Sequence, residues 1–237
     1  GTTTADVDVT FLLPAGQPPI VKNYKIAGDT RFNIDVDGIP ELAEAEMSAV
    51  ITSKNGVPIV VERAMYLNTP DQAFAAGHGS AGVTAPATRW FLAEGATGPF
   101  FDMFILIGNP TNQKAVVEAK YQLIGGGVIT KQYEVEANSR FNIMVDNEGD
   151  ELANAAVSTT LTSTNNVPII VERTMWWPGP TPLQWREAHN SFAETQTGTR
   201  WAVAEGEQGG PRNAETYILI ANTSDFDGVA RVRLLFE

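Results

Sequence analysis

Apolar residues occupy every second position along much of the chain. Within 117–123 the odd positions carry Val, Ala, Tyr and Leu, and 141–145 and 157–161 continue the alternation. A period of two predicts β-strands that turn one face toward a core. Turn-forming residues separate the strands, for example at 109–110 and 125–127. About seven short strands in roughly 110 residues are typical of an antiparallel β-sandwich.

Two kinds of segment depart from this pattern. Glu41–Met47 and its counterpart Asp150–Val157 are the only helix-like stretches, and we expect each to form about one turn between sheets. Residues 66–88 and 176–199 are richer in Pro, Gly and Trp. We expect connecting loops there.

Three phrases occur twice, with offsets of 109, 110 and 111 residues. Such a fixed period indicates a duplicated structural unit, and the small drift in the offset indicates loop insertions. The first two phrases match at six of seven positions and the third at five of seven. The pairs are Arg31–Asp37 with Arg140–Asp146, Val57–Arg63 with Val167–Arg173, and Arg89–Gly95 with Arg200–Gly206.

The predicted fold is therefore all-β, with tandem antiparallel, Ig-like β-sandwich repeats of about 110 residues. A boundary after the Asn109-Pro110 turn divides the chain into units 1–110 and 111–222, with 223–237 as the opening strand of a further unit or a donor strand. The units can instead be counted from the Arg-Trp phrase, which begins at Arg89 and again at Arg200, and residues 89–199 are then one full unit. In this division residues 1–88 lack the opening third of a unit, and residues 200–237 form only an opening third.

Composition narrows the possible partners. The chain has 237 residues, 28 acidic and 16 basic side chains, a net charge of −12 and no cysteine. An acidic surface disfavours nucleic acid, and the absence of cysteine excludes thiol catalysis and cysteine-ligated metals. No apolar run reaches the roughly 18 residues of a membrane helix, so we expect no membrane insertion. No cofactor motif is visible, and we expect none.

Several of these phrases resemble a family of tandem repeats in large exported or cell-surface bacterial proteins, described as a domain of unknown function. The family's units carry W-[FY]-x-A-E-G, I-x-N-P, S-R-x-x-V and V-P-I-V-x-E-R-x-M-[YW] motifs. These correspond to Trp90–Gly95, Ile107–Pro110, Ser139–Val145, Val57–Tyr66 and Val167–Trp176. The last copy departs from the pattern, with Asn222-Thr223 in place of Asn-Pro. The resemblance implies arrays of sandwich domains at the cell surface and names no reaction or ligand.

Charged residues interrupt the apolar strands at matching positions of the repeat. Carboxylates paired across a cleft would suit glycoside hydrolysis, but internal duplication favours ion pairs that close the ends of each sandwich. We therefore interpret these residues as structural and expect no enzymatic activity. They are Glu62, Arg63, Glu94, Glu172, Arg173 and Glu205. His78 and His189 also match in the repeat, and we expect them to hold loops by hydrogen bonds.

Acidic residues gather after two strands, where oxygen ligands could hold calcium. Neither loop matches the full calcium-binding pattern, and a solvated acidic turn is the favoured interpretation. The candidates for a calcium site are Asp35, Asp37, Asp146, Glu148 and Asp150.

Trp176, Trp177 and Trp185 flank a Pro-rich segment. Exposed aromatic rings there would stack on a neighbouring domain or on sugars, and packing between domains is the favoured use.

The sequence as a whole predicts a structural or adhesive extracellular repeat module of a bacterial surface array. Its expected partners are neighbouring copies of the same repeat. Residues 217–220 and 229–236 predict extra strands that would complete the first, truncated sandwich of another molecule and so build a head-to-tail filament. The alternative is a carbohydrate-binding module that uses the three tryptophans on surface glycans.

Overall fold

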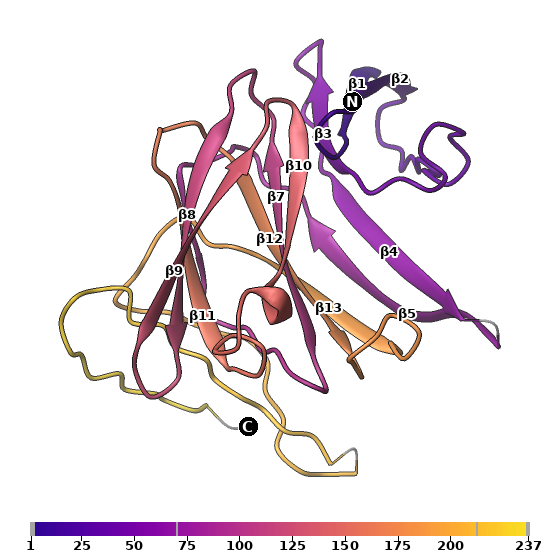
Figure 1. Cartoon of the computed structure of the whole chain (residues 1–237). Helices are drawn as coiled ribbons and strands as arrows, with labels where there is room; N and C mark the ends of the chain where they lie inside the picture. The colour runs from indigo at the N-terminus through magenta and orange to yellow at the C-terminus, as the bar shows by residue number, and fades with distance from the viewer. Residues whose placement is uncertain (1–2, 70, 212, 236–237) are drawn as a thin grey trace.

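The chain is built from β-strands, as the alternation predicts (Figure 1). The computed structural model describes residues 3–69, 71–211 and 213–235, and within these ranges all strand pairs are antiparallel and no α-helix occurs. The predicted all-β class with antiparallel sheets is confirmed. In the described ranges no helix has the length and apolarity to cross a membrane. The elements are β1 (Ala5–Leu12), β2 (Ile20–Ile26), β3 (Ser48–Ser53), β4 (Glu62–Thr69), β5 (Gln72–Ala81), β6 (Arg89–Leu92), β7 (Asp102–Asn109), β8 (Ala115–Leu123), β9 (Val128–Val135), β10 (Ser139–Met144), the 3-10 turn η1 (Val145–Asn147), β11 (Val157–Ser163), β12 (Ile170–Trp177) and β13 (Glu187–Phe192).

Two four-stranded sheets enclose the main core, in a β-sandwich-like arrangement. Their strand orders are β10-β7-β12-β13 and β6-β11-β8-β9. We call residues 87–194 the two-sheet body, because bridges from Ala87 to Ile169 and from Phe91 to Glu194 join its edges. Inward-facing residues of both sheets, including Trp90, are almost fully buried. Each such large side chain contributes about 1.5–3 kcal/mol by leaving water.

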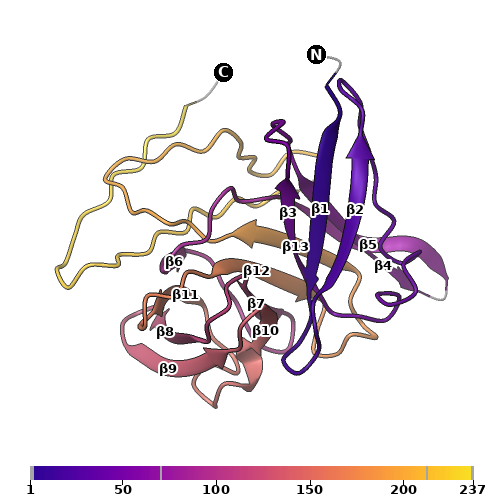
Figure 2. The same ribbon diagram turned by 90° about the horizontal axis from the view of Figure 1, so that it is seen from above.

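The strands β2, β1 and β3 form a separate N-terminal sheet. Its core face carries the alternate residues of β1, such as Val7 and Phe11, packed against segments that include the buried Leu42. The register repeats that of β9-β8-β11, since Val7 pairs with Ser53 and Val117 pairs with Ser163. The N-terminal sheet, which lies beside the two-sheet body in Figure 2, thus has the register of three strands of one sheet of that body.

The strands β4 and β5 form a hairpin that repeats β12 and β13. Met65 pairs with His78 in the hairpin, and Met175 pairs with His189 in the body. In the body, β12 also pairs with β7. Among the described residues β4 pairs only with β5, so its other edge has no neighbouring strand.

The hairpin packs on the outer face of the sheet that contains β12. Met175 points into the core of the body, and strand alternation therefore places Glu172 and Trp176 on the opposite face. There Arg63 Nη2 lies 3.0 Å from Glu172 Oε2, and the rings of His78 and Trp176 meet edge to face at 5.3 Å. The side of the hairpin that packs on this face carries Arg63 and His78. The corresponding side of β12-β13 faces the core of the body.

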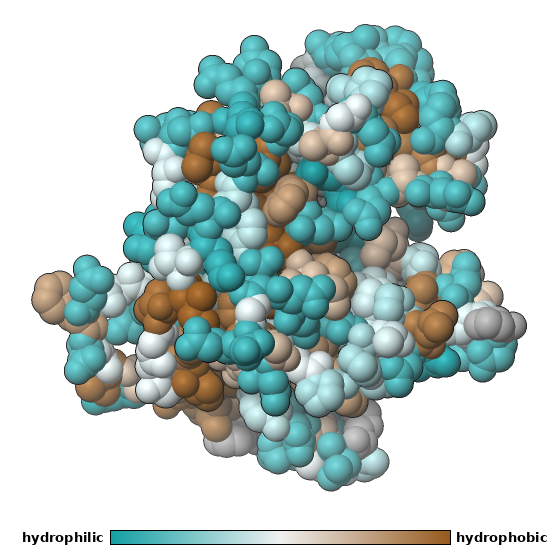
Figure 3. All heavy atoms as spheres, in the orientation of Figure 1, coloured by the Kyte–Doolittle hydropathy of each residue, from teal (hydrophilic) through white to brown (hydrophobic). Residues whose placement is uncertain are grey.

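The C-terminal tail, residues 200–235, has no strand among its described residues and only a bridge from Gly209 to Ala214. It runs along the side of the body away from the N-terminal sheet (Figure 1). Hydrophobic residues lie at the surface along that side (Figure 3). The exposed apolar side chains of the tail include Trp201, Val203, Tyr217, Ile218, Leu219, Ile220, Phe226, Val229, Val232, Leu234 and Leu235. The predicted donor strands, residues 217–220 and 229–236, are therefore unpaired as far as residue 235. Residue 236 lies outside the described residues.

The structure differs from the expected division of the chain. A boundary between 1–110 and 111–222 would separate β6 and β7 from the strands with which they pair, β10, β11 and β12. The division of the chain that starts a unit at the Arg-Trp phrase fits the two-sheet body, because that phrase contains β6, the first strand of the body. The turn at Asn109 connects two strands of one body and is not a boundary between bodies.

Two local expectations also need correction. The segments 66–88 and 176–199, expected as loops, contain β5 and β13, because pairing with the preceding strand overrides their Pro and Gly content. The helix-like stretches Glu41–Met47 and Asp150–Val157 form turns and no helix. Each turn buries one leucine, Leu42 or Leu152, and this burial accounts for the helix-like spacing of apolar residues.

Candidate assembly site

An ion-pair cluster joins β12 and β13 to the segment that follows β6. The Arg173 guanidinium is 2% exposed. Its Nη1 donates to the Glu94 carbonyl oxygen at 3.0 Å and to Glu94 Oε2 at 2.7 Å. Its Nη2 lies 3.1 Å from His189 Nδ1, and His189 Nε2 lies 3.6 Å from Glu94 Oε1. Burial lowers the pKa of Arg173, and the Glu94 carboxylate opposes this shift. The expected partnership of Glu94 with a repeat arginine thus exists in this body.

The matching cluster in the hairpin consists of Arg63 and His78. Among the described residues, it lacks a carboxylate from its own copy of the repeat. Arg63 Nη1 lies 3.3 Å from His78 Nδ1, as in the body. No described residue of the N-terminal part takes the place of Glu94, and Arg63 contacts Glu172 on the outer face of the body instead. His78 is 9% exposed, and its Nε2 has no hydrogen-bond partner.

Identical side chains are buried in one copy of the repeat and partly exposed in the other. Val167, Ile169 and Val171 lie in the core of the body, each less than 5% exposed. Their counterparts Val57, Ile59 and Val61 are only partly buried. The residue types match, so the difference comes from what covers them. In the body that cover includes β6 and β7, and the described N-terminal part has no counterpart of either strand.

The Arg31–Asp37 phrase shows the same effect. Its counterpart Arg140–Asp146 begins in β10, which pairs along β7. Residues 31–36 form no strand in spite of the near-identical sequence. An isolated strand gains nothing from its pattern when no partner satisfies its backbone groups.

The tail carries the sequences of β6 and β7. Residues 200–206 match 89–95, and residues 215–222 match β7 with the same Ile-Leu-Ile core and a final Asn. Trp90 is 1% exposed in the body, whereas Trp201 is 63% exposed. The tail therefore presents to solvent the side chains that fill the core of the body.

Two local motifs of the body are already formed in the tail. Trp90 Nε1 donates to the carbonyl oxygen of Ala87 at 3.1 Å, and Trp201 Nε1 donates to that of Gly198 at the same distance. Both bonds span three residues, so they need no partner strand.

The Asn turn that follows β7 is the second such motif. Asn109 Nδ2 donates to the carbonyl oxygen of Gln113, and Asn222 Nδ2 donates to that of Phe226, each at 2.7 Å. Ser224 Oγ donates to Asn222 Oδ1, as a threonine hydroxyl does to Asn109. Replacement of the motif's proline by Thr223 thus leaves this turn intact.

The remaining charged candidates have separate surroundings. Glu62 and Glu205 are exposed. Glu172 accepts hydrogen bonds from Arg63 and from Asn190 Nδ2. Arg140, 8% exposed, pairs with Glu46 of the N-terminal part at 2.6 Å, a contact that no motif predicted. His78 and His189 lie in strands β5 and β13 and not in the expected loops.

The five acidic residues considered for calcium do not come together. No group of three or more potential metal ligands occurs among the described residues. Asp146 accepts the backbone N–H groups of Gly98 and Met103 at 3.1 and 2.9 Å, and burial raises its pKa. Glu148 accepts the Tyr133 hydroxyl at 2.7 Å. Asp35, Asp37 and Asp150 are exposed.

The tryptophans after β12 pack within the protein. Trp176 is 6% exposed and stacks on Trp185 with ring centroids 4.9 Å apart. It also makes the edge-to-face contact with His78. Trp185 Nε1 donates to the buried Asp102, and Trp177 packs against the core. The expectation of exposed rings fails for Trp176, which joins the hairpin to the body.

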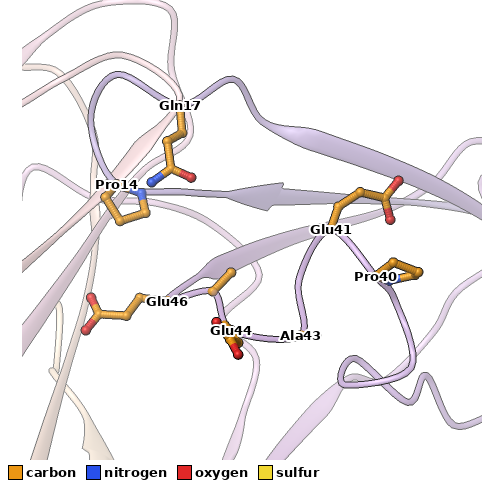
Figure 4. A pocket seen from close by; sticks show the side chains of 8 residues that line it. Pro14, Gln17, Pro40, Glu41, Ala43, Glu44 and Glu46 are labelled. Carbon is orange, nitrogen blue, oxygen red and sulfur yellow. The ribbon is translucent and has the colours of Figure 1, made fainter.

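A hollow near the N-terminal sheet is lined by residues of two loops, 14–17 and 40–46 (Figure 4). Glu41 bonds to Lys22 at 2.9 Å. Glu46 points away from the hollow and pairs with Arg140 (Figure 4). Two of the three carboxylates around the hollow therefore already pair with basic side chains.

Acidification is expected to weaken the docking of the hairpin. Burial, with the nearby charges of Arg63 and His189, lowers the pKa of His78 to about 4, whereas an exposed histidine titrates near 6.5. The undocked form therefore binds an additional proton between these values, and stability falls as pH decreases from about 6.5 to 4. Burial lowers the pKa of His189 also, with the same sign.

Thermal unfolding of the wild type and of His78→Phe between pH 7 and 4 measures this effect. The variant is expected to lose part of the pH dependence while His189 retains its own. Identical pH profiles would contradict the prediction.

Comparisons with known proteins give no assignment. No model of a protein family and no curated protein sequence matches the chain significantly. The crystal structure of Thermotoga maritima 1070 is similar over 49% of this chain and 100% of that one, with 12% identity and a TM-score of 0.42. The Anabaena sensory rhodopsin transducer is similar over 39% and 91%, with 18% identity and a TM-score of 0.34. At TM-scores below 0.5 neither similarity assigns a function to this chain.

Proposed function

We propose that this chain is a non-enzymatic structural module of an extracellular bacterial array, built from Ig-like sandwich repeats of about 110 residues. Copies join head to tail when residues 200–222 of one chain enter the N-terminal part of the next as its β6 and β7. One observation carries this proposal: the strands without a described counterpart in the N-terminal part are those whose sequences lie unpaired in the tail. Of the residues considered for catalysis, which are Glu62, Glu94, Glu172 and Glu205, two support a structural role because Glu94 and Glu172 each pair with an arginine.

The repeat fixes the expected register of strand addition. Trp90 pairs with Leu161 in the body, so Trp201 would pair with Ile51 on the free edge of β3. Ile105 pairs with Arg173, so Ile218 would pair with Arg63 on the free edge of β4. Main-chain hydrogen bonds then supply affinity, and the alternate side chains entering the core supply specificity. Because donor and acceptor surfaces differ, each added copy leaves a new acceptor, and the contact propagates.

An acidic surface suits such an array. The net charge of −12 keeps repeated copies soluble and limits binding to anionic polymers. The resemblance of the motifs to exported repeat proteins supports the same location.

Assembly is expected to depend on one face of the donor strand only. Ile218→Asn would bury an unsatisfied amide in the completed core and raise the concentration required for assembly more than about 100-fold. The neighbouring Leu219→Asn is the matched control, because its counterpart Leu106 is only partly buried and faces out of the core.

Sedimentation velocity over a concentration series measures both variants against the wild type. We expect growing species for the wild type and for Leu219→Asn, and a persistent monomer for Ile218→Asn. A wild-type chain that stays monomeric at every concentration would refute strand addition.

A further inference from the structure

The Arg63 cluster points to the group that a donor strand must bring. In the body, the Arg173 and His189 side chains share one carboxylate, that of Glu94, which lies two residues beyond the end of β6 and four residues after Trp90. In the hairpin the arginine and histidine are present in the same relative positions, but the Nε2 of His78 is buried without a partner. The geometry of the cluster is therefore short of one acceptor.

The tail contains that acceptor at the matching position. Glu205 follows Trp201 by four residues, as Glu94 follows Trp90. It is exposed. A strand that seats Trp201 against β3 in the register of the body would therefore bring the Glu205 carboxylate to the position that Glu94 occupies.

Resting on the proposed strand addition, we propose that Glu205 of a second copy binds Arg63 and His78 and sets the register of the donor segment. Arg63 exchanges its present partner, Glu172 of its own chain, for Glu205 of the incoming one. Glu205 is thus a specificity-determining residue of the assembly site.

The exchange also moves the hairpin. Its Arg63 and His78 side now faces Glu172 and Trp176 on the outer face of the body, whereas the corresponding side of β12-β13 faces an enclosed core. The hairpin cannot contact both partners with one side. Binding of Glu205 therefore releases the hairpin from the body, and the Arg63–Glu172 contact holds a free chain closed until a donor arrives.

Charge alone would not make the donor segment bind in one register only. The N-terminal part carries other basic side chains, but Lys22 and Lys25 already pair with Glu41 and Asp6 at the surface. Exposed pairs of this kind discriminate weakly. A carboxylate that enters a cluster with a buried, unpartnered His78 atom meets a hydrogen-bonding requirement that a misaligned strand leaves unmet.

A labelled peptide of residues 198–226 tests the proposal on the full-length chain. The acceptor is the full chain carrying Ile218→Asn, whose own tail cannot compete. We expect the wild-type peptide to bind, and Glu205→Gln in the peptide to weaken binding about 10- to 100-fold, the range for a hydrogen bond between charged groups. Asp225→Asn is the control, because it removes the same charge at a turn position where the body already has Asn112.

A double-mutant cycle identifies the contact. The cycle is measured in an acceptor that also carries Glu172→Gln, so that loss of the Arg63–Glu172 contact does not itself change binding. In that acceptor Arg63→Gln is expected to weaken binding of the wild-type peptide by a similar factor and to leave binding of the Glu205→Gln peptide unchanged. Equal binding of the wild-type and Glu205→Gln peptides would overturn the role of Glu205 and leave strand addition standing. Additive losses would also overturn it, by placing Glu205 against another group. If the wild-type peptide does not bind and the full chain stays monomeric, the proposed function itself fails.

Discussion

Trp90→Ala is expected to lower the free energy of unfolding of the two-sheet body by about 3–5 kcal/mol, the usual cost of truncating a buried Trp. The indole is 1% exposed. Its Nε1 donates to the carbonyl oxygens of Ala87 and Ile169, at 3.1 and 3.0 Å. The substitution leaves a cavity between the sheets and removes both bonds, which tie β6 to the start of β12.

Trp201→Ala is the matched control, because the same phrase in the tail packs against nothing comparable. The monomer should keep its stability within about 0.5 kcal/mol, as for other surface substitutions. Urea unfolding followed by circular dichroism, at a concentration that favours monomers, measures both. Equal losses for the two variants would contradict the structure. In the assembled protein the proposal reverses the result for Trp201, which then fills a core.

Glu94→Ala is expected to cost about 2–3 kcal/mol, because it leaves the buried Arg173 charge without its carboxylate. The Arg173 side chain is 2% exposed, but the Glu94 side chain is 35% exposed and Arg173 keeps its bond to the backbone carbonyl oxygen of residue 94, so the cost stays below that of a fully buried pair. The matched control, Glu205→Ala, should leave monomer stability nearly unchanged since Glu205 is exposed.

A double variant separates burial of a charge from loss of a contact. Glu94→Ala combined with Arg173→Met should recover much of the loss, because an apolar side chain of similar volume replaces the unpaired charge. The same urea unfolding measurements test this. A double variant as unstable as Glu94→Ala alone would show that the loss has another source.

Much of the fold follows from the sequence, because strand alternation and turn residues act locally. The period of two at 117–123 and 157–161 predicted β8 and β11, and the offset of about 110 residues between the repeated phrases agrees with the matching registers of β1 and β8. The pairing of a repeat arginine with Glu94 also follows from the pattern, since a charge within an apolar strand requires a partner.

Tertiary structure decided what the repeated phrases become. Residues 31–35 and 140–144 have nearly the same sequence, yet only the second segment forms a strand, because only the second has β7 beside it. Trp90 and Trp201 differ in the same way. Burial depends on neighbours that a local pattern does not contain, and the choice of Glu172 as the partner of Arg63 depends on how the hairpin packs on the body. The sequence by itself determined which side chains match, and only the folded chain decided which of them have their partners.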